Sequence, residues 1–148
     1  MRKLAIYTLL ALAALMSGCA KNNGDIGLWF GLWHLDTIEV DGEPDAAYNG
    51  CYYFLFQGKV FNLNQVDEAM HSYDSRVAQW SESDDGSTIT IDFADDRYTP
   101  YFGDGYPSVY LSTVTTLRVL KLTTTTMVLE HEEQSTGSTI TYHLTRWD

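Results

Sequence analysis

The side chains with the most potential chemistry are the histidines, the cysteines and several acidic turns. The four histidines are scattered along the chain, and no pair has a spacing suited to one metal ion: His34, His71, His131 and His143. The run His131-Glu132-Glu133 alternates across both faces of an extended strand, so it cannot chelate as one cluster. We therefore expect a solvated strand end here and no metal site.

Acidic pairs are the next candidates, because carboxylates bind calcium and serve in hydrolysis. Asp84-Asp85-Gly86, Asp95-Asp96 and Asp104-Gly105 could each hold calcium in part, but none matches the twelve-residue EF-hand loop, and solvated turns are the favoured interpretation. The sequence has no Gly-x-Ser-x-Gly motif and no glycine-rich phosphate loop. With 20 acidic residues some carboxylates will lie close by chance, so we expect neither an enzyme nor a bound cofactor.

The first eighteen residues have the three zones of a secretory signal. Arg2-Lys3 is charged, Leu4 to Met16 is apolar, and Ser17-Gly18 is small, directly before Cys19. The apolar run is too short to cross about 30 Å of hydrocarbon as a helix. We expect residues 1–18 to be a cleaved signal peptide rather than a membrane span.

The segment Leu15-Met16-Ser17-Gly18-Cys19 resembles the bacterial lipobox. The resemblance implies a diacylglyceryl thioether on Cys19 and an acyl group, such as palmitate, on its new amino terminus. Several chains hold a protein at a membrane far longer than one does. Ala20 resembles the outer-membrane address of lipoproteins, so the expected location is the cell envelope, anchored at the outer membrane. The alternative is an ordinary signal peptide with a chance cysteine.

After cleavage, residues 19–27 form a polar tether, and residues 28–148 suffice for one domain. Seven basic residues then face 20 acidic ones, for a net charge of −13 with histidine neutral. This charge argues against nucleic acid and anionic lipid headgroups as partners, and indicates either solubility alone or an acidic docking patch. Cys51 has no disulfide partner once Cys19 is lipidated, and we expect it to be a buried apolar thiol.

Eight segments have the period-two or aromatic and β-branched pattern of strands. They span about 32–40, 50–57, 59–65, 76–83, 87–93, 113–122, 126–133 and 138–147. Short glycine turns join several of them as hairpins, and the four threonines 123–126 predict another turn. A sandwich or a closed barrel fits this pattern. Closure is favoured because it removes exposed edges, so we predict an all-β, eight-stranded antiparallel up-and-down β-barrel. A single helical turn over 66–71 is a weaker expectation.

The two ends of this domain carry a resemblance to the lipocalin-like (calycin-like) lipoproteins. Gly31-Leu32-Trp33 opens the first strand, Asp41-Gly42 closes it, and the last strand ends in Leu144-Thr145-Arg146-Trp147. The resemblance implies that Trp33 plugs one end of the barrel and that Arg146 packs across its ring. A guanidinium over an indole stabilises such a contact by about 0.5–2 kcal/mol.

A lipocalin-like barrel implies a binding module for a small apolar or aromatic ligand, since eight strands leave room for one modest molecule. The pocket would lie at the end away from Trp33 and Arg146. Candidate ligand contacts are interior side chains and the aromatic loop 94–110 as its rim: Tyr53, Leu55, Trp80, Ile91 and Tyr142 inside, with Tyr98, Tyr101, Phe102, Tyr106 and Tyr110 in the loop.

Two alternatives remain open at this stage. The loop rings would either form a lid or stacking platform, or fold back to cover the barrel's own core. In the second case the protein is a non-catalytic structural or interaction module with a filled barrel, and its outer face docks an envelope protein through side chains such as Tyr101 and Phe102.

Overall fold

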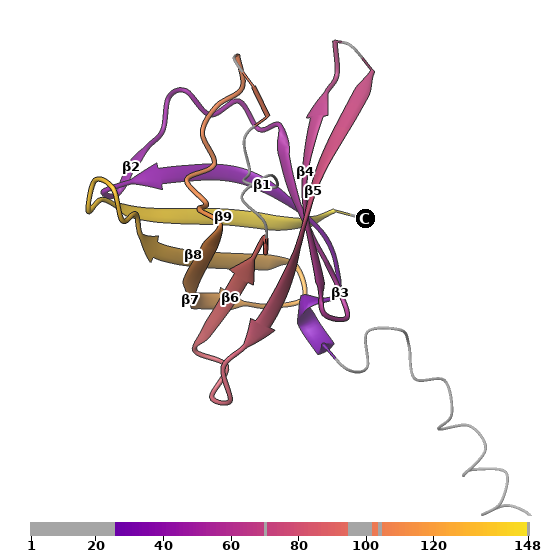
Figure 1. Ribbon diagram of the computed structural model, residues 1–148, viewed down its shortest axis with the longest axis vertical. Coiled ribbons are helices and arrows are strands. Elements are labelled where there is room, and N and C mark those ends of the chain that lie inside the picture. The colour runs from indigo at the N-terminus through magenta and orange to yellow at the C-terminus, as the bar shows by residue number, and fades with distance from the viewer. Residues whose placement is uncertain (1–25, 70, 95–101, 104, 148) are drawn as a thin grey trace, which may run out of the picture.

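The described residues, 26–69, 71–94, 102–103 and 105–147, fold mainly into strands, as their alternating apolar pattern predicts. The computed structural model is shown in Figure 1. Its described elements are a 3-10 turn, η1 (Gly27–Trp29), and the strands β1 (Gly31–Val40), β2 (Glu43–Pro44), β3 (Tyr52–Gln57), β4 (Val60–Asp67), β5 (Ser72–Glu82), β6 (Thr88–Asp92), β7 (Val114–Leu122), β8 (Thr126–Glu132) and β9 (Thr139–Trp147).

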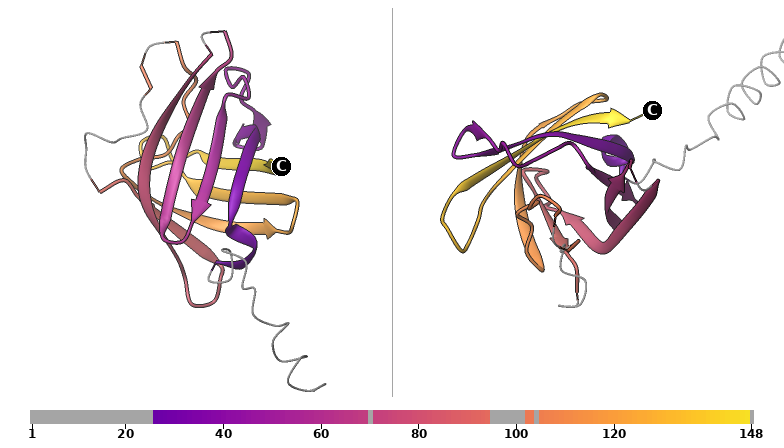
Figure 2. Two further views of the ribbon diagram at one scale, coloured as in Figure 1. Left: turned by 90° about the vertical axis from the view of Figure 1, so that its right-hand side faces the viewer. Right: turned by 90° about the horizontal axis from the view of Figure 1, so that it is seen from above.

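The strands pair in one antiparallel sheet with the order β2-β1-β3-β4-β5-β6-β7-β8-β9, and β9 pairs again with β1. That last pairing runs from Leu32 opposite Trp147 to Val40 opposite Ile140, so the sheet closes on itself. β2 is a two-residue extension beside the end of β1, and the eight longer strands surround one core (Figure 2). The eight-stranded up-and-down barrel is thereby confirmed, and the sandwich alternative is excluded.

Alternation along each strand decides which side chains fill the barrel. In β3 and β6 every second residue is buried, and in β9 the inward set includes Ile140, Tyr142 and Leu144. β1 changes its parity at Asp36, where a bulge against β9 lets both Leu35 and Ile38 face inward.

The turns follow the local sequence. Asp41 and Gly42 both have positive φ angles, of 54° and 84°, and reverse the chain between β1 and β2. The threonine run makes the expected turn between β7 and β8, where the Thr123 amide donates to the Thr126 carbonyl at 2.9 Å. The Thr123 and Thr126 hydroxyls lie 2.8 Å apart and close the same turn.

The helical turn expected over 66–71 was wrong. Val66 and Asp67 continue β4, where they pair with Tyr73 and Ser72 of a β5 that begins four residues earlier than expected. Strand alternation simply continues through Val66, and cross-strand pairing there satisfies the backbone that one isolated helical turn would leave unpaired. The resulting β4–β5 hairpin extends from the top of the barrel in Figure 1.

Candidate functional site

The closed end of the barrel is built around Trp33 and Arg146. The guanidinium carbon lies 4.3 Å from the centre of the Trp33 ring, which is fully buried. Arg146 also donates to three backbone carbonyls, those of Phe30 at 2.6 Å, Leu28 at 2.7 Å and Thr124 at 2.6 Å. The structure therefore brings the two end-closing residues together, and the arginine ties η1 and the β7–β8 turn to the end of β9.

Gly31 is the residue that allows this approach. A side-chain Cβ at this position would lie 2.6 Å from Nη1 of Arg146, and the Gly31 φ of 127° is in a region that favours glycine. The Gly-x-Trp pattern thus has two separate roles here, close approach at Gly31 and plugging at Trp33.

The interior of the barrel is filled by its own side chains. Phe54 packs edge-to-face on Phe61 at 5.2 Å and lies 5.9 Å from the Tyr142 ring. The core is rich in rings and in branched aliphatic side chains, all at most 8% exposed: Trp29, Trp33, Leu35, Ile38, Tyr52, Phe54, Phe56, Phe61, Leu63, Trp80, Ile89, Ile91, Phe93, Leu117, Met127, Leu129, Ile140, Tyr142 and Leu144. Three of the predicted interior candidates, Trp80, Ile91 and Tyr142, belong to this packed core.

The interior assignment of Tyr53 and Leu55 was wrong. Both point to the outer face of β3, and the inward positions are Tyr52, Phe54 and Phe56. The segment 51–56 is apolar at every position, so its sequence does not show which parity faces the core. The pairing of β3 with β1 and β4 decides it.

Two buried tyrosines hold the loop at the open end of the barrel, and a buried histidine contacts one of them. The Tyr52 hydroxyl donates to the Pro107 carbonyl at 2.7 Å, and the Tyr142 hydroxyl donates to the Val109 carbonyl at 2.8 Å. Nε2 of His131 lies 3.0 Å from the same Tyr142 oxygen, within a stacked ring pair. Val109 itself is buried, so this part of the loop covers the core.

The loop candidates have different positions. Phe102 packs against the core beside Tyr52, and the guanidinium of Arg76 lies over the Phe102 ring, 4.8 Å from its centre. Tyr110 is half-buried and donates to Asp45 at 2.8 Å, while Tyr106 is exposed at the rim. Tyr98 and Tyr101 lie outside the described residues. Where the loop is described, most of its rings cover the barrel's core.

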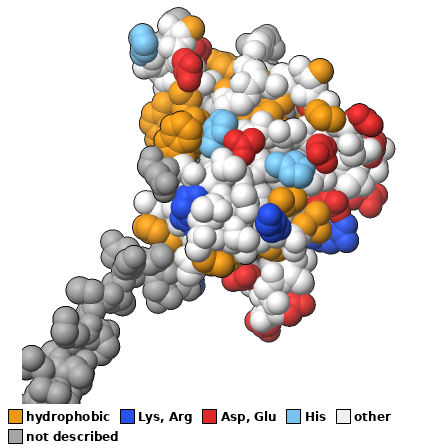
Figure 3. All heavy atoms as spheres, turned by 180° about the vertical axis from the view of Figure 1, so that it is seen from behind, with side chains coloured by type: hydrophobic (Ala, Val, Ile, Leu, Met, Phe, Trp, Pro, Cys, Tyr) orange, Lys and Arg blue, Asp and Glu red, His pale blue; other side chains and the backbone are white. Residues whose placement is uncertain are grey.

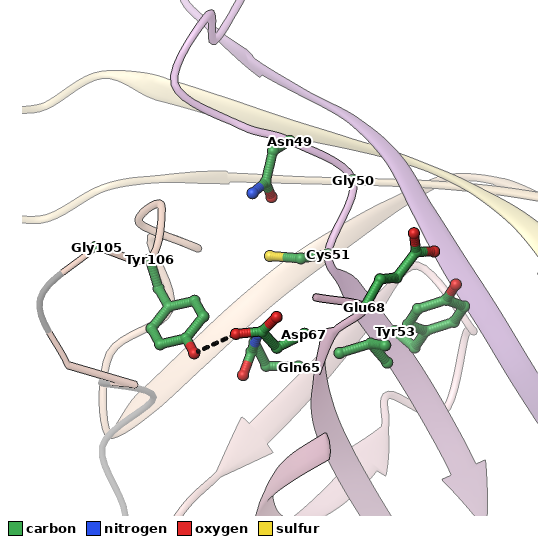
Figure 4. A pocket seen from close by; sticks show the side chains of 10 residues that line it. Asn49, Gly50, Cys51, Tyr53, Gln65, Asp67, Glu68, Gly105 and Tyr106 are labelled. Carbon is green, nitrogen blue, oxygen red and sulfur yellow. Dashed lines mark hydrogen bonds between the residues drawn. The ribbon is translucent and has the colours of Figure 1, made fainter. Parts of the chain in front are cut away.

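A polar hollow of about 380 Å³ lies at this open end. It forms where β3 begins and β4 ends, and the loop at Tyr106 makes its other wall (Figure 4). In Figure 4 the side chains of Cys51, Gln65, Asp67 and Tyr106 face a common space. The Tyr106 hydroxyl donates to Asp67 at 3.2 Å across it. We call this the mouth hollow; it is lined by Asn49, Gly50, Cys51, Tyr53, Gln65, Val66, Asp67, Glu68, Gly105 and Tyr106.

Gln65 is the buried polar member of the mouth hollow. Its side chain is 3% exposed, and its Nε2 has no hydrogen-bond partner. An unpaired buried amide costs roughly 1–3 kcal/mol, so a ligand that accepts from it recovers stability. Gln65 was not among the residues predicted for a site. The signal was present, because alternation from Phe61 and Leu63 places this polar residue on the inward face.

The thiol and the phenol that line the mouth hollow are both held in their protonated, unreactive forms. Burial raises the pKa of the Cys51 thiol to about 11 and so keeps it protonated at neutral pH. Tyr106 is exposed, but partial desolvation at the rim raises its pKa, and its hydrogen bond to Asp67 acts in the same direction. The hollow therefore offers hydrogen-bond donors and acceptors, with negative charge on Asp67 and Glu68, rather than a nucleophile.

Within the described ranges, no three metal-binding side chains gather closely enough to hold an ion. The described elements also include no helix long and apolar enough to cross a membrane.

The carboxylate of Asp85 is stabilised within its own turn. The hydroxyls of Ser83 and Ser87 both donate to its Oδ1 at 2.7 Å, and these bonds lower the pKa of Asp85 to about 2.

No protein-family model matches this chain, and no curated protein matches its sequence. Solved structures do match. A lipocalin-like protein from Bacteroides uniformis is 20% identical, with a TM-score of 0.59, over 82% of this chain and 100% of its own. An uncharacterized protein from Bacteroides eggerthii is 20% identical, with a TM-score of 0.60, over 80% of this chain and 99% of its own. Together with the closed eight-stranded sheet, these likenesses show that the chain has a lipocalin-like β-barrel fold.

Proposed function

We propose that this protein is a lipid-anchored lipoprotein of the outer membrane whose lipocalin-like barrel binds one small polar ligand in the mouth hollow. The observation that carries the proposal is the buried Nε2 of Gln65, a residue that lines the hollow, because this nitrogen has no hydrogen-bond partner. Folded proteins rarely keep such a group without a use for it.

The lining of the mouth hollow indicates the ligand's chemistry. Gln65 requires an acceptor, whereas Asp67 and Glu68 accept from donors and repel anions. A neutral or cationic molecule with both donors and acceptors therefore fits. A volume of about 380 Å³ is near the lower end of the roughly 300–1,000 Å³ of ligand pockets. This ligand is more polar than the apolar or aromatic one expected from the sequence, because aromatic side chains already fill the barrel.

Binding is tested by NMR titration of the 15N-labelled protein with two panels. One contains polar metabolites, namely sugars, amino acids, small amides and polyamines, and the other contains fatty acids, bile acids and porphyrins. We expect a polar compound to shift the amides of residues 51, 65–68 and 105–106 and to lose this effect in Gln65→Leu. A matched Thr90→Ala control changes a surface position on β6. Binding of the apolar panel alone, inside the barrel, would contradict the proposal.

The anchor rests on the lipobox resemblance at Cys19 and needs its own test. Cells that express the protein and are fed labelled palmitate should incorporate label into the wild type and not into Cys19→Ala. Mass spectrometry of the wild type should find residue 19 at the amino terminus with acyl chains attached. An unmodified wild-type chain in the soluble fraction would remove the anchor and leave the binding proposal standing.

A second candidate function follows from the filled barrel. A module whose barrel is filled by its own side chains can serve as an interaction protein of the envelope, and its outer face carries exposed large side chains such as Tyr73 and Trp147. Crosslinking in cells separates the two functions. One captured partner, lost in a Tyr101→Ala/Phe102→Ala variant and insensitive to Gln65→Leu, would favour the interaction protein.

A further inference from the structure

A second hollow lies on the outer wall of the barrel. It has a volume of about 260 Å³ and lies over β1, β3, β4, β5 and the end of β9. We call it the outer hollow; its lining residues are Leu32, Tyr53, Asn64, Val66, Tyr73 and Trp147. Figure 3 shows that hydrophobic side chains gather into one exposed patch on this face, beside a histidine.

Two rings form a corner in the outer hollow. Tyr53 and Trp147 lie 5.5 Å apart with an interplanar angle of 87°, and His34 supports them from below at 4.8 Å and 5.8 Å. The His34 ring is itself held on both sides, by Asp36 at 2.7 Å and by the Gly50 carbonyl at 2.9 Å. Trp147 remains 54% exposed and Tyr73 67% exposed. The corner is thus fixed in place while its apolar faces stay open to an occupant.

A polar group lies beside these rings. Asn64 points outward from β4, level with Tyr53 in the strand register, yet its side chain is only 8% exposed. Its Oδ1 has no hydrogen-bond partner. As at Gln65, an unpaired buried amide is costly, and an occupant that brings an O–H or N–H donor would satisfy it.

We infer that the outer hollow binds one ring of a neutral saccharide. A sugar ring covers aromatic faces with its C–H groups and carries hydroxyl donors for Asn64 at its edge. The volume admits one ring and excludes a long acyl chain. None of the six lining side chains is charged, so the site does not select an ion. This inference does not rest on the mouth hollow, although Tyr53 and Val66 border both hollows.

The test uses the full lipidated chain in phospholipid nanodiscs and a panel of neutral mono- and hexasaccharides of glucose, galactose, mannose and N-acetylglucosamine. Tryptophan fluorescence reports on the site, because Trp29, Trp33 and Trp80 are buried and Trp147 is exposed. We expect one saccharide to protect Trp147 from acrylamide quenching in a saturable manner. Isothermal titration calorimetry, which does not depend on Trp147 fluorescence, should find binding of the same saccharide about tenfold weaker in Trp147→Ala and in Asn64→Leu, and partly restored in Trp147→Phe.

Two controls keep the result specific. Leu120→Ala removes an equally exposed apolar side chain from β7, outside the outer hollow, and should bind as the wild type does. Gln65→Leu should leave saccharide protection of Trp147 intact, so failure of the mouth hollow and failure of the outer hollow are distinguishable. Near-ultraviolet circular dichroism verifies that each variant is folded.

Three results would overturn the inference. The first is that no saccharide protects Trp147 at millimolar concentration. The second is equal protection by tetramethylammonium, which would identify a cation site of aromatic faces. The third is self-association in sedimentation that Trp147→Ala abolishes, which would show that a second copy of the chain covers the patch.

Discussion

Arg146, near the end of β9, ties the last strand of the barrel to the segment that leads into β1 and to the β7–β8 turn. It combines a cation–π contact with Trp33 and three hydrogen bonds to backbone carbonyls. Lysine keeps the charge but cannot donate in three fixed directions. We expect Arg146→Lys to lower the free energy of unfolding by about 2 kcal/mol in urea denaturation. Arg118→Lys, on the exposed face of β7, should change it by less than about 0.5 kcal/mol.

The Gln65→Leu variant distinguishes a ligand-binding role of the Gln65 amide from a structural one. Leucine has a similar size and no polar atom, so Gln65→Leu removes a buried donor that lacks a partner. We expect the thermal midpoint to stay equal to that of the wild type or to rise, while binding of the polar ligand is lost. A clear fall in the midpoint would show that the amide stabilises the fold, and would count against its assignment to a ligand site.

Cys51 is expected to react slowly. Burial raises its thiol pKa from the ordinary value of 9.0 to about 11, so the reactive thiolate is scarce at neutral pH. In Cys19→Ala, which leaves Cys51 as the sole thiol, alkylation by iodoacetamide should accelerate about tenfold per pH unit up to pH 10. A rate that levels off near pH 8.5 would contradict this assignment.

At the scale of elements, β8 and β9 hold the loop over the open end through one pair of side chains. His131 and Tyr142 are buried and stacked, and Tyr142 reaches the Val109 carbonyl. Burial lowers the pKa of His131 from its ordinary value of 6.5, against smaller opposing effects of Glu132 and Glu133. The folded protein therefore takes up this proton less readily than the unfolded chain does.

The sign of the pH dependence follows from that difference. Above pH 6.5 the His131 imidazole is neutral in both the folded and the unfolded state, so its contribution to stability is fully present. Below pH 6.5 the unfolded chain binds the proton first. The free energy of unfolding therefore falls by at most about 1.4 kcal/mol per pH unit. Urea unfolding between pH 5 and 7.5 measures the slope. His131→Gln should flatten it, and His71→Gln, at an exposed turn, should retain it. An unchanged slope in His131→Gln would refute the assignment.

At the scale of the whole molecule, side chains fill the interior of the barrel, which is not an open ligand cavity. Phe54 lies at its centre and is fully buried, and the next residue along β3, Leu55, lies on the outer face. Phe54→Ala should cost about 3–5 kcal/mol and open a dry cavity, whereas Leu55→Ala should cost under about 1.5 kcal/mol. Denaturation and benzene-induced stabilisation measure both effects. Benzene should stabilise Phe54→Ala alone; stabilisation of the wild type would indicate an internal cavity.

Much of this architecture could be read from local residue patterns. The period-two segments placed all eight barrel strands within a few residues, because alternation reports a half-buried strand directly. The turns at Asp41-Gly42 and Thr123–Thr126 were readable for the same local reason. The helical turn over 66–71 was not, because β5 supplies partners from a separate part of the sequence.

The amino-acid sequence by itself determined the all-β class and the eight strands, since residue type and spacing encode these features, and its resemblance to the lipocalin-like lipoproteins implied the contact of Trp33 with Arg146. Only the tertiary structure decided which face of β3 points inward, that aromatic side chains fill the barrel, and that Gln65 and Asn64 lie unpaired beside two hollows. The physical reason is barrel closure. Strands that are distant in the sequence decide which face of the sheet a side chain lies on and which residues it contacts, and those contacts form only when β9 has paired with β1.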